Sequence, residues 1–429
     1  MRLELGIINI TDVQLGPSAA IKDGTLYVDS DALVAHLLEN EERLVDVKVH
    51  LARPGESVRI TPVKDVIEPR IKVDSEAEVF PGTVSKVLPV GSGRTHVLRG
   101  AAVVTIGKIV GFQEGIVDMC GPGADYTPFS QLNNVVLEFV LQEGLPAHDR
   151  EQALRFSGLR AAKFLAEPAK DMEPDEITTY ETLPLMEGVK RYPDLPRVAY
   201  LQMLQSQGLL HDTYVYGVDA KQILPTLIHP TELMDGAIIS GNCVSACDKN
   251  TTYHHQNNPV VADLFAKHGE ELQFVGVIIT NENVFLDDKI RSSDWSAKLA
   301  EYLSLDGIII SQEGFGNPDT DLILNAKKIE ALGIPTVIIT DEYAGTDGAS
   351  QSLADADPSA DAVVTGGNAN EIVILPKLDR VIGDINVVTV IAGGSDKALR
   401  EDGSLEVELQ AITGATNELG FGKLTTKGY

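Results

Sequence analysis

The clearest hydrophobic pattern lies in the last third of the chain, where continuous apolar runs alternate with amphipathic stretches. The apolar runs have the length and composition of buried strands, and they lie at 272–280, 307–311, 336–340, 362–365 and 372–375. Apolar positions recur with a helical period at 293–303 and 318–332, and the second stretch has Pro318 in its first turn and Gly333 just after its end. Strands that alternate with helices predict βαβ units, so we expect an open parallel-sheet α/β domain over 243–429.

The first part of the chain has a different pattern, in which short alternating runs are broken by proline and glycine. These runs lie at 45–50, 57–60, 79–90 and 95–106. They predict a β-rich N-terminal domain over 1–130, with one helix at 30–39 whose N-cap we expect at Ser30 or Asp31. Residues 131–242 mix strands and helices less regularly and form a mixed α/β middle segment. The predicted fold class therefore combines α+β and α/β architecture.

Polar side chains follow three of the predicted parallel strands where each strand ends. The triplets are Thr280-Asn281-Glu282, Ser311-Gln312-Glu313 and Thr340-Asp341-Glu342. Ligands of open α/β sheets bind outside the carboxyl ends of the strands, so we expect the triplets to share one rim. A glycine loop at 314–317 leads into the next helix, where free N–H groups suit a carboxylate or phosphate. Polar loops are also common after strands, and the loop matches no nucleotide-binding motif.

Composition and charge exclude some classes of partner. The formal net charge is −28, which argues against a nucleic-acid or anionic-membrane partner because both need a basic face. Three cysteines in 429 residues are too few for a disulfide framework, so we expect a reducing, cytoplasmic environment. No 18-residue apolar run occurs, so no membrane-spanning segment is expected.

Two of the three cysteines and two of the nine histidines gather between Ser240 and Asn258. One interpretation is a loop with small buried cysteines. A second is a metal site made of Cys243, Cys247, His254 and His255, but this spacing is not a standard zinc pattern. In a third, the chain cleaves itself and leaves Cys243 as an N-terminal nucleophile whose own amine is the base.

A fourth interpretation takes the same cleavage further. The thiol of Cys243 attacks the carbonyl of Asn242 and replaces the peptide bond by a thioester. β-Elimination then leaves a dehydroalanine, which tautomerises to an imine and hydrolyses to ammonia and a pyruvoyl group. That ketone could condense with a substrate amine and withdraw electrons from it. Spacing alone does not separate this interpretation from the N-terminal nucleophile.

The sequence from Gly241 to Pro259, GNCVSACDKNTTYHHQNNP, resembles the processing site of the component B proprotein of clostridial glycine/sarcosine/betaine reductase. Residues 1–13, 120–130 and 313–322 are similar to that family as well, so the resemblance covers essentially the whole chain. It implies cleavage between Asn242 and Cys243 into 242 and 187 residues, with masses of about 26 and 20 kDa out of 46.1 kDa. It also implies a pyruvoyl cofactor derived from Cys243 and no metal.

The family resemblance further implies partners and a substrate. A separate selenocysteine-containing subunit attacks the substrate's α-carbon, ammonia leaves, and the carboxymethyl group passes to carrier protein A on the way to acetyl phosphate. This chain has no selenocysteine and no Cys-x-x-Cys pair, so such a reaction needs a nucleophile from another chain in a hetero-oligomer. Glycine is the favoured small amino-acid substrate over sarcosine and betaine, because betaine's quaternary nitrogen cannot condense with a ketone and aromatics for a cage are few.

Candidate roles follow from this interpretation. Residues that could polarise the scissile carbonyl or move protons during cleavage are Ser245, Lys249, Thr251, His254 and His255. Residues that could bind the substrate are Glu282 and Glu313 for its ammonium group and Gly314, Gly316 and Asn317 for its carboxylate. The alternative functions are a self-cleaving N-terminal-cysteine hydrolase and a non-catalytic, zinc-stabilised assembly subunit.

Overall fold

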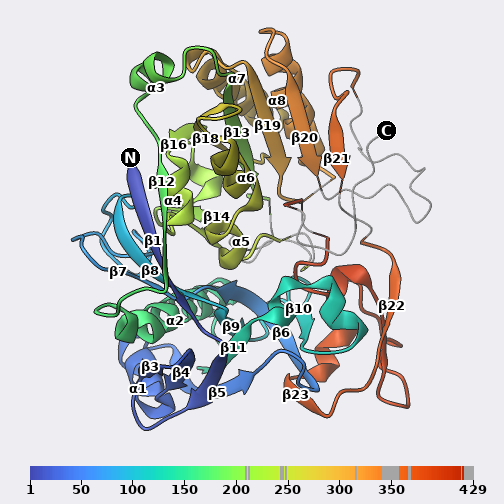
Figure 1. The fold of residues 1–429 in the computed structure, drawn as a ribbon. Coiled ribbons are helices and arrows are strands. Elements are labelled where there is room, and N and C mark those ends of the chain that lie inside the picture. The colour runs from blue at the N-terminus through green and yellow to red at the C-terminus, as the bar shows by residue number, and fades with distance from the viewer. Residues whose placement is uncertain are drawn as a thin grey trace.

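The chain folds into two lobes, one above the other in Figure 1. The computed structural model describes residues 1–207, 210, 213–241, 246, 249–314, 316–340, 357–365, 369–416 and 418–419. The lower lobe contains the largest N-terminal sheet together with the last described strands, and the upper lobe contains the mostly parallel sheet (Figure 1). Residues 249–252, which follow the predicted cleavage site, contact both lobes.

The main sheet of the lower lobe has the strand order β10-β6-β9-β11-β5, with β23 also paired to β6. Its strands are β5 (Leu44–Ala52), β6 (Val58–Ile67), β9 (Ala101–Ile106), β10 (Gly115–Asp118), β11 (Asn133–Leu141) and β23 (Arg380–Gly383). Helix α2 (Ala147–Ala166) packs on this sheet through Leu154, Leu159 and Leu165. Strand β6 is buried along its whole length, although it includes Lys64 and Asp65.

Two smaller sheets belong to the N-terminal part of the chain, and the four-stranded one reaches the upper lobe, where Leu3, Leu5 and Val97 share a core with the parallel sheet (Figure 1). One has the order β12-β1-β8-β7, and the other the order β2-β4-β3. Their strands are β1 (Arg2–Asn9), β2 (Asp12–Leu15), β3 (Ala20–Lys22), β4 (Thr25–Val28), β7 (Arg70–Lys72), β8 (Gly93–Arg99) and β12 (Glu176–Glu181).

Helix α1 (Ser30–Asn40) lies where the sequence predicts a helix, but its N-cap is Asp29. The predicted caps, Ser30 and Asp31, are wrong because both residues are already helical. Asp29 has an extended backbone and its Oδ1 accepts the N–H of Ala32 at 3.0 Å, which is the geometry of an N-cap.

The sheet of the upper lobe has the order β16-β18-β13-β19-β20-β21. Its strands are β13 (Arg197–Leu204), β16 (Thr226–Ile228), β18 (Gln273–Asn281), β19 (Gly307–Gln312), β20 (Thr336–Thr340) and β21 (Val363–Thr365). All neighbours are parallel except the edge strand β16, which is antiparallel to β18. The predicted open parallel sheet is therefore confirmed, but the predicted strand at 372–375 is not part of it, because that run forms a separate antiparallel pair with residues 405–408.

Helices cover both faces of this sheet. Helices α7 (Leu286–Tyr302) and α8 (Asp319–Glu330) share a core with Leu201 and Met203 of β13. Helix α6 (Pro259–Lys267) shares a second core with Tyr200 and Leu204 of the same strand. Because successive side chains of a strand point to opposite faces, β13 lies between two helical layers at the centre of the lobe.

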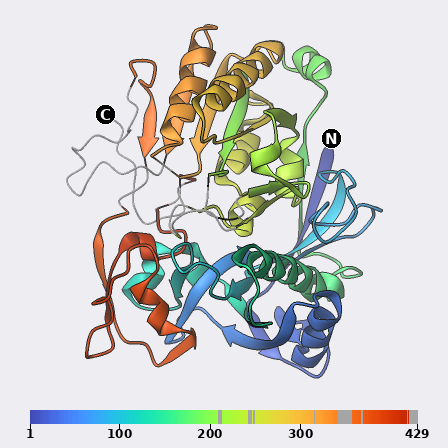
Figure 2. The same cartoon turned by 180° about the vertical axis from the view of Figure 1, so that it is seen from behind.

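The chain then returns to the lower lobe. Strands β22 (Ile372–Leu375) and β24 (Leu405–Glu408) form an antiparallel pair, and β23 between them in sequence joins β6. The view from behind in Figure 2 shows this C-terminal part (red) beside the strands of the lower lobe. The lower lobe is thus completed by residues far from it in sequence.

Shorter elements fill the space around the two lobes. They are β14 (Thr213–Val215), β15 (Val218–Asp219), β17 (Ile238–Ser240), α3 (Leu185–Arg191), α4 (Pro230–Met234), α5 (Thr252–Gln256) and 3₁₀ turns at Pro122–Tyr126, Pro128–Gln131, Glu167–Ala169, Ala220–Gln222, Ile385–Thr389 and Leu409–Ala411.

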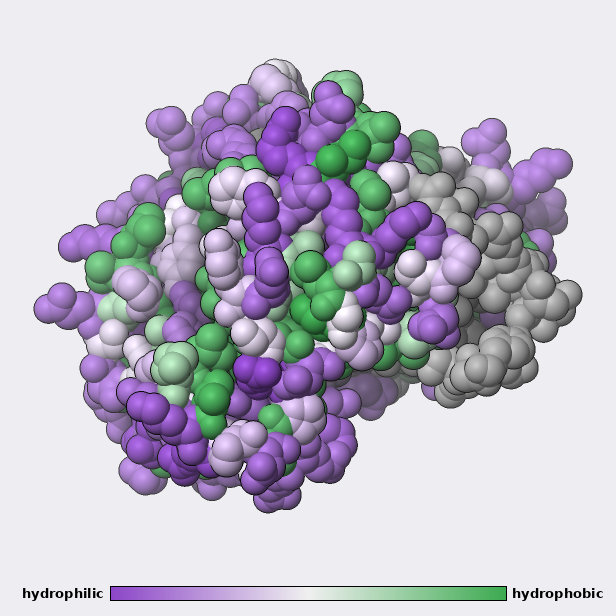
Figure 3. Space-filling model, turned by 90° about the horizontal axis from the view of Figure 1, so that it is seen from above, coloured by the Kyte–Doolittle hydropathy of each residue, from purple (hydrophilic) through white to green (hydrophobic). Residues whose placement is uncertain are grey.

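The architecture confirms the predicted combination of α+β and α/β structure. The proposed division of the chain at 130 and 242 remains a proposal; β13 precedes residue 242 in sequence and lies inside the sheet that follows it. Seen from above, the molecule is mostly hydrophilic with scattered hydrophobic groups of atoms (Figure 3). Within the described parts of the chain, no helix has the length and apolarity needed to cross a bilayer.

Candidate functional site

Described residues flank the predicted cleavage site on both sides in the sequence. Asn242, Cys243 and Ser245 themselves lie outside the described residues, as does Cys247 of the alternative metal site. The described anchors are Ser240-Gly241 before the site, Ala246 within this stretch, and residues 249–258 after it.

Ser240 ends the short buried strand β17, which pairs with β14 so that Ser240 lies opposite Thr213. Its Oγ donates to the carbonyl of Gly241 at 3.0 Å. Its backbone N–H donates to Oγ1 of Thr252 at 3.1 Å. The backbone of Ser240, two residues before Asn242, is thus bonded to Thr252, nine residues after Cys243.

Two buried carboxylates, one from each lobe, hold the chain after the site by its backbone. Glu313 at the end of β19 accepts the N–H of Asn250 at 3.1 Å. Asp65 in β6 accepts the N–H of Thr252 at 2.9 Å and the hydroxyl of the same residue at 2.7 Å. The segment that follows the predicted cleavage site is therefore fixed between the two lobes.

Helix α5 begins at Thr252, the residue that Asp65 holds, and its histidines are buried. Thr251 is the N-cap: its Oγ1 accepts the N–H of His254 at 3.3 Å, and Nδ1 of His254 accepts the N–H of Thr251 at 3.1 Å. This bond puts the proton of neutral His254 on Nε2. His255 lies with Nδ1 3.4 Å from Nε2 of Gln202.

Burial determines the charge of both imidazoles. It lowers the pKa of His254 to about 3, with a smaller contribution from His255, and it lowers the pKa of His255 to about 3 as well. Both rings are therefore neutral at pH 7. A base with so low a pKa accepts protons poorly, so a neutral N–H donor is the role that this environment favours for each ring.

A buried pair of lysines lies beside the clamp. Lys249, one of the predicted residues, donates from Nζ to the carbonyl of Lys64. The ammonium of Lys64 is 3.4 Å from Glu151, and burial lowers the pKa of Lys64. The predicted involvement of Lys249 stays a prediction, and its main described contact is with the backbone of β6.

Ala246 rests against the C-terminal part of the chain. Its carbonyl accepts the N–H of Gly414 at 3.0 Å. A Cβ added at Gly115 in β10 would lie 2.3 Å from the Cβ of Ala246, which is too close for two carbon atoms. The absence of a side chain at Gly115 therefore makes room for Ala246.

Two of the three strand ends predicted to share a rim lie on either side of β13, whereas Asp341 and Glu342 of the third triplet lie outside the described residues. Met203 of β13 pairs with Thr280 on one side and Gln312 on the other, so these strands end at one level. Glu282 and Glu313 are both buried there. With its amide nitrogen turned toward the glutamates, Gln205 donates to Oε2 of Glu282 and to the carbonyl of Glu313, each at 2.6 Å.

Glu313 has further protein partners that bear on its predicted role. Its Oε2 accepts the N–H of Gln205 at 2.9 Å and the hydroxyl of Thr213 at 3.1 Å. These bonds, together with the one from Asn250, favour a role in holding the cleavage segment. Direct contact of Glu313 or Glu282 with a substrate ammonium stays a prediction.

The glycine loop after β19 is occupied by side chains of its own helix. Gly314 and Gly316 have positive φ angles of 89° and 90°, which favour glycine. The N–H of Gly316 donates to Oδ1 of Asp319 at 3.0 Å, and the exposed Asn317 presents its carbonyl to Lys289 at 2.9 Å. A carboxylate already at this helix start weighs against a substrate carboxylate there, and the predicted anion site stays a prediction.

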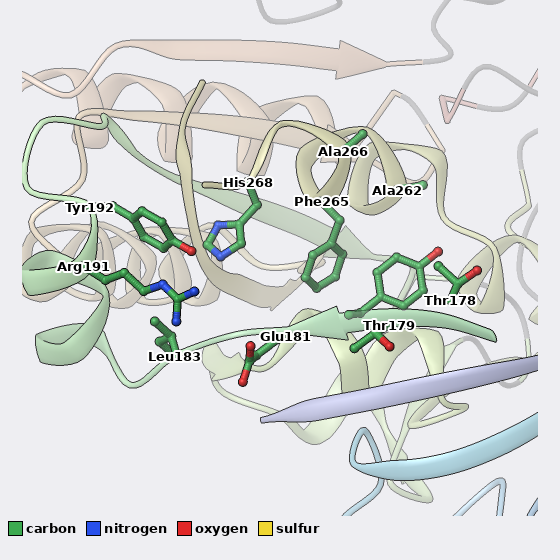
Figure 4. A pocket seen from close by; sticks show the side chains of 11 residues that line it. Thr178, Thr179, Glu181, Leu183, Arg191, Tyr192, Ala262, Phe265, Ala266 and His268 are labelled. Atoms are coloured by element: carbon green, nitrogen blue, oxygen red, sulfur yellow. The ribbon is translucent and has the colours of Figure 1, made fainter. Parts of the chain in front are cut away.

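A surface pocket of about 510 Å³ lies elsewhere, between β12, α3 and α6 (Figure 4). Arg191, Tyr192, His268 and Phe265 line it. The backbone N–H of Phe274, at the amino end of β18, donates to His268 at 3.0 Å. The rim lies at the other end of this strand, about 23 Å from Phe274 at about 3.3 Å per residue, so this pocket is separate from residues 240–258.

Sequence patterns did not point to Asp65, Lys64 or Gln205. A signal was present for the first two: a lysine and an aspartate within the apolar run of β6 are costly to bury unless they serve a purpose. Their partners are 185 and 187 residues away in sequence, and the sequence alone does not indicate such pairings.

Comparisons with known proteins assign the chain to a family. The family model for "Glycine/sarcosine/betaine reductase component B subunits" matches residues 1–427. "Glycine reductase complex component B subunits alpha and beta" of Acetoanaerobium sticklandii is 64% identical, and "Sarcosine reductase complex component B subunit alpha" of Peptoclostridium acidaminophilum is 56% identical; each match covers 100% of both chains. The more distant "D-proline reductase proprotein PrdA" of A. sticklandii is 22% identical over 76% of this chain and 53% of that protein.

No solved structure matches this chain. The family and full-length matches nevertheless agree with one another and with the sequence resemblance. Component B is one part of a multi-component reductase, so the chain acts together with partner subunits in an oxidoreductase complex. The chain belongs to the glycine/sarcosine/betaine reductase component B family.

Proposed function

We propose that this chain is a self-processing proprotein of the substrate-binding component B of glycine reductase. In this proposal the bond between Asn242 and Cys243 breaks, and Cys243 becomes the pyruvoyl group at the start of the second fragment. The observation that carries the proposal is the double anchoring of the chain on both sides of that bond, by Asp65, Glu313 and the Ser240–Thr252 hydrogen bond. A "proprotein" among the relatives supports it as well.

The anchors would serve cleavage by limiting the freedom of the scissile region. Attack of a thiol on the preceding carbonyl requires near-contact geometry, and fixed geometry can supply several kcal/mol of the barrier. Buried hydrogen bonds hold Ser240 before the scissile bond, and Asn250 and Thr252 after it. Neutral N–H groups of His254 and His255 are candidates to stabilise charge that develops on oxygen.

The residues present fit a pyruvoyl group in this place. Its α-keto carbonyl would need hydrogen-bond donors, and the two histidines after the site can supply neutral N–H groups because burial lowers the pKa of each to about 3. When formed, the group would supply a ketone to which a substrate amine can bind covalently. The chain's own contribution is to position that ketone at the rim formed by the ends of β18, β13 and β19.

Glycine is the proposed substrate. A glycine reductase component is among the relatives at 64% identity and a sarcosine reductase component at 56%, which favours glycine as the sequence interpretation does. The chain lacks selenocysteine, so a selenocysteine-containing partner subunit would attack the substrate and carrier protein A would receive the two-carbon product. Cleavage of the substrate C–N bond would release ammonia on the way to acetyl phosphate.

Denaturing electrophoresis of the chain purified from an active complex tests the proposal. We expect fragments of about 26 and 20 kDa, with the smaller one labelled by a carbonyl reagent such as phenylhydrazine. A Cys243→Ala chain should remain whole, whereas Cys120→Ala, a matched change at a free cysteine in the lower lobe, should cleave normally. An active complex with only the intact chain would refute the proposal, and a free N-terminal cysteine would favour the nucleophile hydrolase.

A further inference from the structure

Asp65 is a buried carboxylate of the lower lobe, distant in sequence from the predicted cleavage site. Its side chain is 2% exposed and lies in β6, the fully buried strand of the main sheet. Pairing of β6 with β9 shifts register between Val63 and Asp65, so β6 carries one extra residue, Lys64, at this point. Such bulges re-aim side chains, and they are frequent next to active sites.

Hydrogen bonds connect the Asp65 carboxylate through Thr252 to the backbone of Ser240, two residues before Asn242. Oδ1 of Asp65 accepts the N–H of Thr252 at 2.9 Å and its Oδ2 accepts the hydroxyl of Thr252 at 2.7 Å. The same hydroxyl oxygen accepts the N–H of Ser240 at 3.1 Å. Asp65, Thr252 and Ser240 are all buried, so water does not compete for these bonds.

We propose that Asp65 is a positioning residue for chain cleavage, acting through Thr252 on the backbone of Ser240. Because the Thr252 hydroxyl must donate to Asp65, its lone pairs face Ser240, and the strand before the site is held at a fixed distance from the helix after it. The inference rests on the proposed cleavage between Asn242 and Cys243. Asp65 makes no contact with the reacting atoms in this account; it orients the residue that holds their neighbour.

The bulge gives the arrangement a geometric origin. With regular pairing of β6, Asp65 would not lie opposite Thr105 of β9. The extra residue brings the two opposite each other, and the Thr105 hydroxyl donates to the Asp65 carbonyl at 3.5 Å. The extra residue turns the carboxylate toward helix α5, which belongs to the segment after the cleavage site. The lower lobe thereby contributes to a reaction whose reacting residues, Asn242 and Cys243, lie far from Asp65 in the sequence.

The test compares cleavage rates of full-length variants, expressed together with the partner subunits and followed from the intact chain to the two fragments. Thr252→Val keeps the shape of the side chain and removes the hydroxyl, and we expect cleavage at least about tenfold slower. Thr252→Ser keeps the hydroxyl and loses only a methyl group, so we expect a rate close to that of the unchanged chain. Asp65→Asn keeps the Thr252 hydroxyl, but its single side-chain oxygen cannot accept both the N–H and the hydroxyl of Thr252, so we expect slow cleavage there as well.

A matched control is Thr105→Val, the same change at a buried threonine that donates to the Asp65 carbonyl and not to its carboxylate. Its cleavage rate should equal that of the unchanged chain, even if its melting temperature falls. A positioning role predicts that the cleavage rate follows the hydrogen bonds from Asp65 through Thr252 to Ser240, and not the melting temperature, across these variants. If the valine variant does not fold, the asparagine variant decides.

The outcomes separate this inference from the proposed function. Folded Thr252→Val or Asp65→Asn chains that cleave at the unchanged rate would overturn the role of Asp65 and leave the cleavage proposal standing. Slow cleavage in Thr252→Ser and Thr105→Val, in proportion to lost stability, would also overturn it. An unchanged chain that never cleaves in an active complex would instead refute the proposed function itself.

Discussion

The two proposed fragments share one β-sheet, which predicts that they remain together after cleavage. Strand β13 belongs to the first fragment and lies between β18 and β19 of the second, with eight residue pairs on one side and six on the other. In the lower lobe, β23 of the second fragment pairs with β6 of the first. Cleavage at one bond therefore leaves the two pieces interlocked.

The size of the effect follows from the side chains of β13. Leu201, Met203 and Leu204 are fully buried, and burying such side chains contributes about 1.5–3 kcal/mol each, or about 5–9 kcal/mol together. That is a large share of the roughly 5–15 kcal/mol that stabilises a typical protein. Removing β13 would thus unfold the upper lobe, and separation of the fragments should require denaturant.

Size-exclusion chromatography of the cleaved protein at increasing urea concentrations measures this coupling. We expect co-elution of both fragments under native conditions and separation at a urea midpoint that Leu201→Ala lowers, because the truncation costs about 2–5 kcal/mol. Leu15→Ala, a matched change at a side chain that is 56% exposed, should change stability by less than about 0.5 kcal/mol. Fragments that separate without denaturant, or equal midpoints for both variants, would refute the shared-sheet account.

Three further predictions follow from the described contacts. The pKa of His255 is lowered to about 3 against an unfolded value near 6.5, so its contribution to stability is present above pH 6.5 and is lost as pH falls toward 3. From pH 7 to 5 this loss is about 2 kcal/mol, and urea unfolding should show a correspondingly shallower pH dependence for His255→Gln; an unchanged dependence would contradict the burial argument. Asp118→Ala strands the buried guanidinium of Arg59, which Asp118 now holds at 2.6 Å, and should destabilise the chain by about 3–5 kcal/mol in the same assay. Gly115→Ala would crowd Ala246 and should slow cleavage on a denaturing gel, whereas unchanged cleavage would show that the segment can shift at no cost.

The upper sheet could be predicted from sequence because its strands are buried on both faces. Runs such as 307–311 are apolar throughout, and a proline and a glycine bracket the helix that follows. Those signals are local, and they gave β19 and α8 (Asp319–Glu330) within a few residues. Pro318 proved to be the N-cap of α8 and not its first residue.

The long-range features could not be predicted in the same way. That β13 lies between β18 and β19, and that β23 joins β6, depends on which strands meet in space, and similar apolar runs do not identify their neighbours. The candidate site divides along the same line. The cluster around Cys243 is visible in the sequence, but the clamp by Asp65 and Glu313 joins positions that are 187 and 63 residues from their partners.

The mass of the smaller fragment tests the central claim most directly. Intact-mass spectrometry of the chain from an active complex should give a fragment that begins at position 243 and carries a pyruvoyl group in place of cysteine, with neither the sulfur nor the amine. Reduction with borohydride should then add two hydrogens at the ketone. A fragment whose mass retains an unmodified Cys243, or an active complex that contains only the uncleaved chain, would contradict the account.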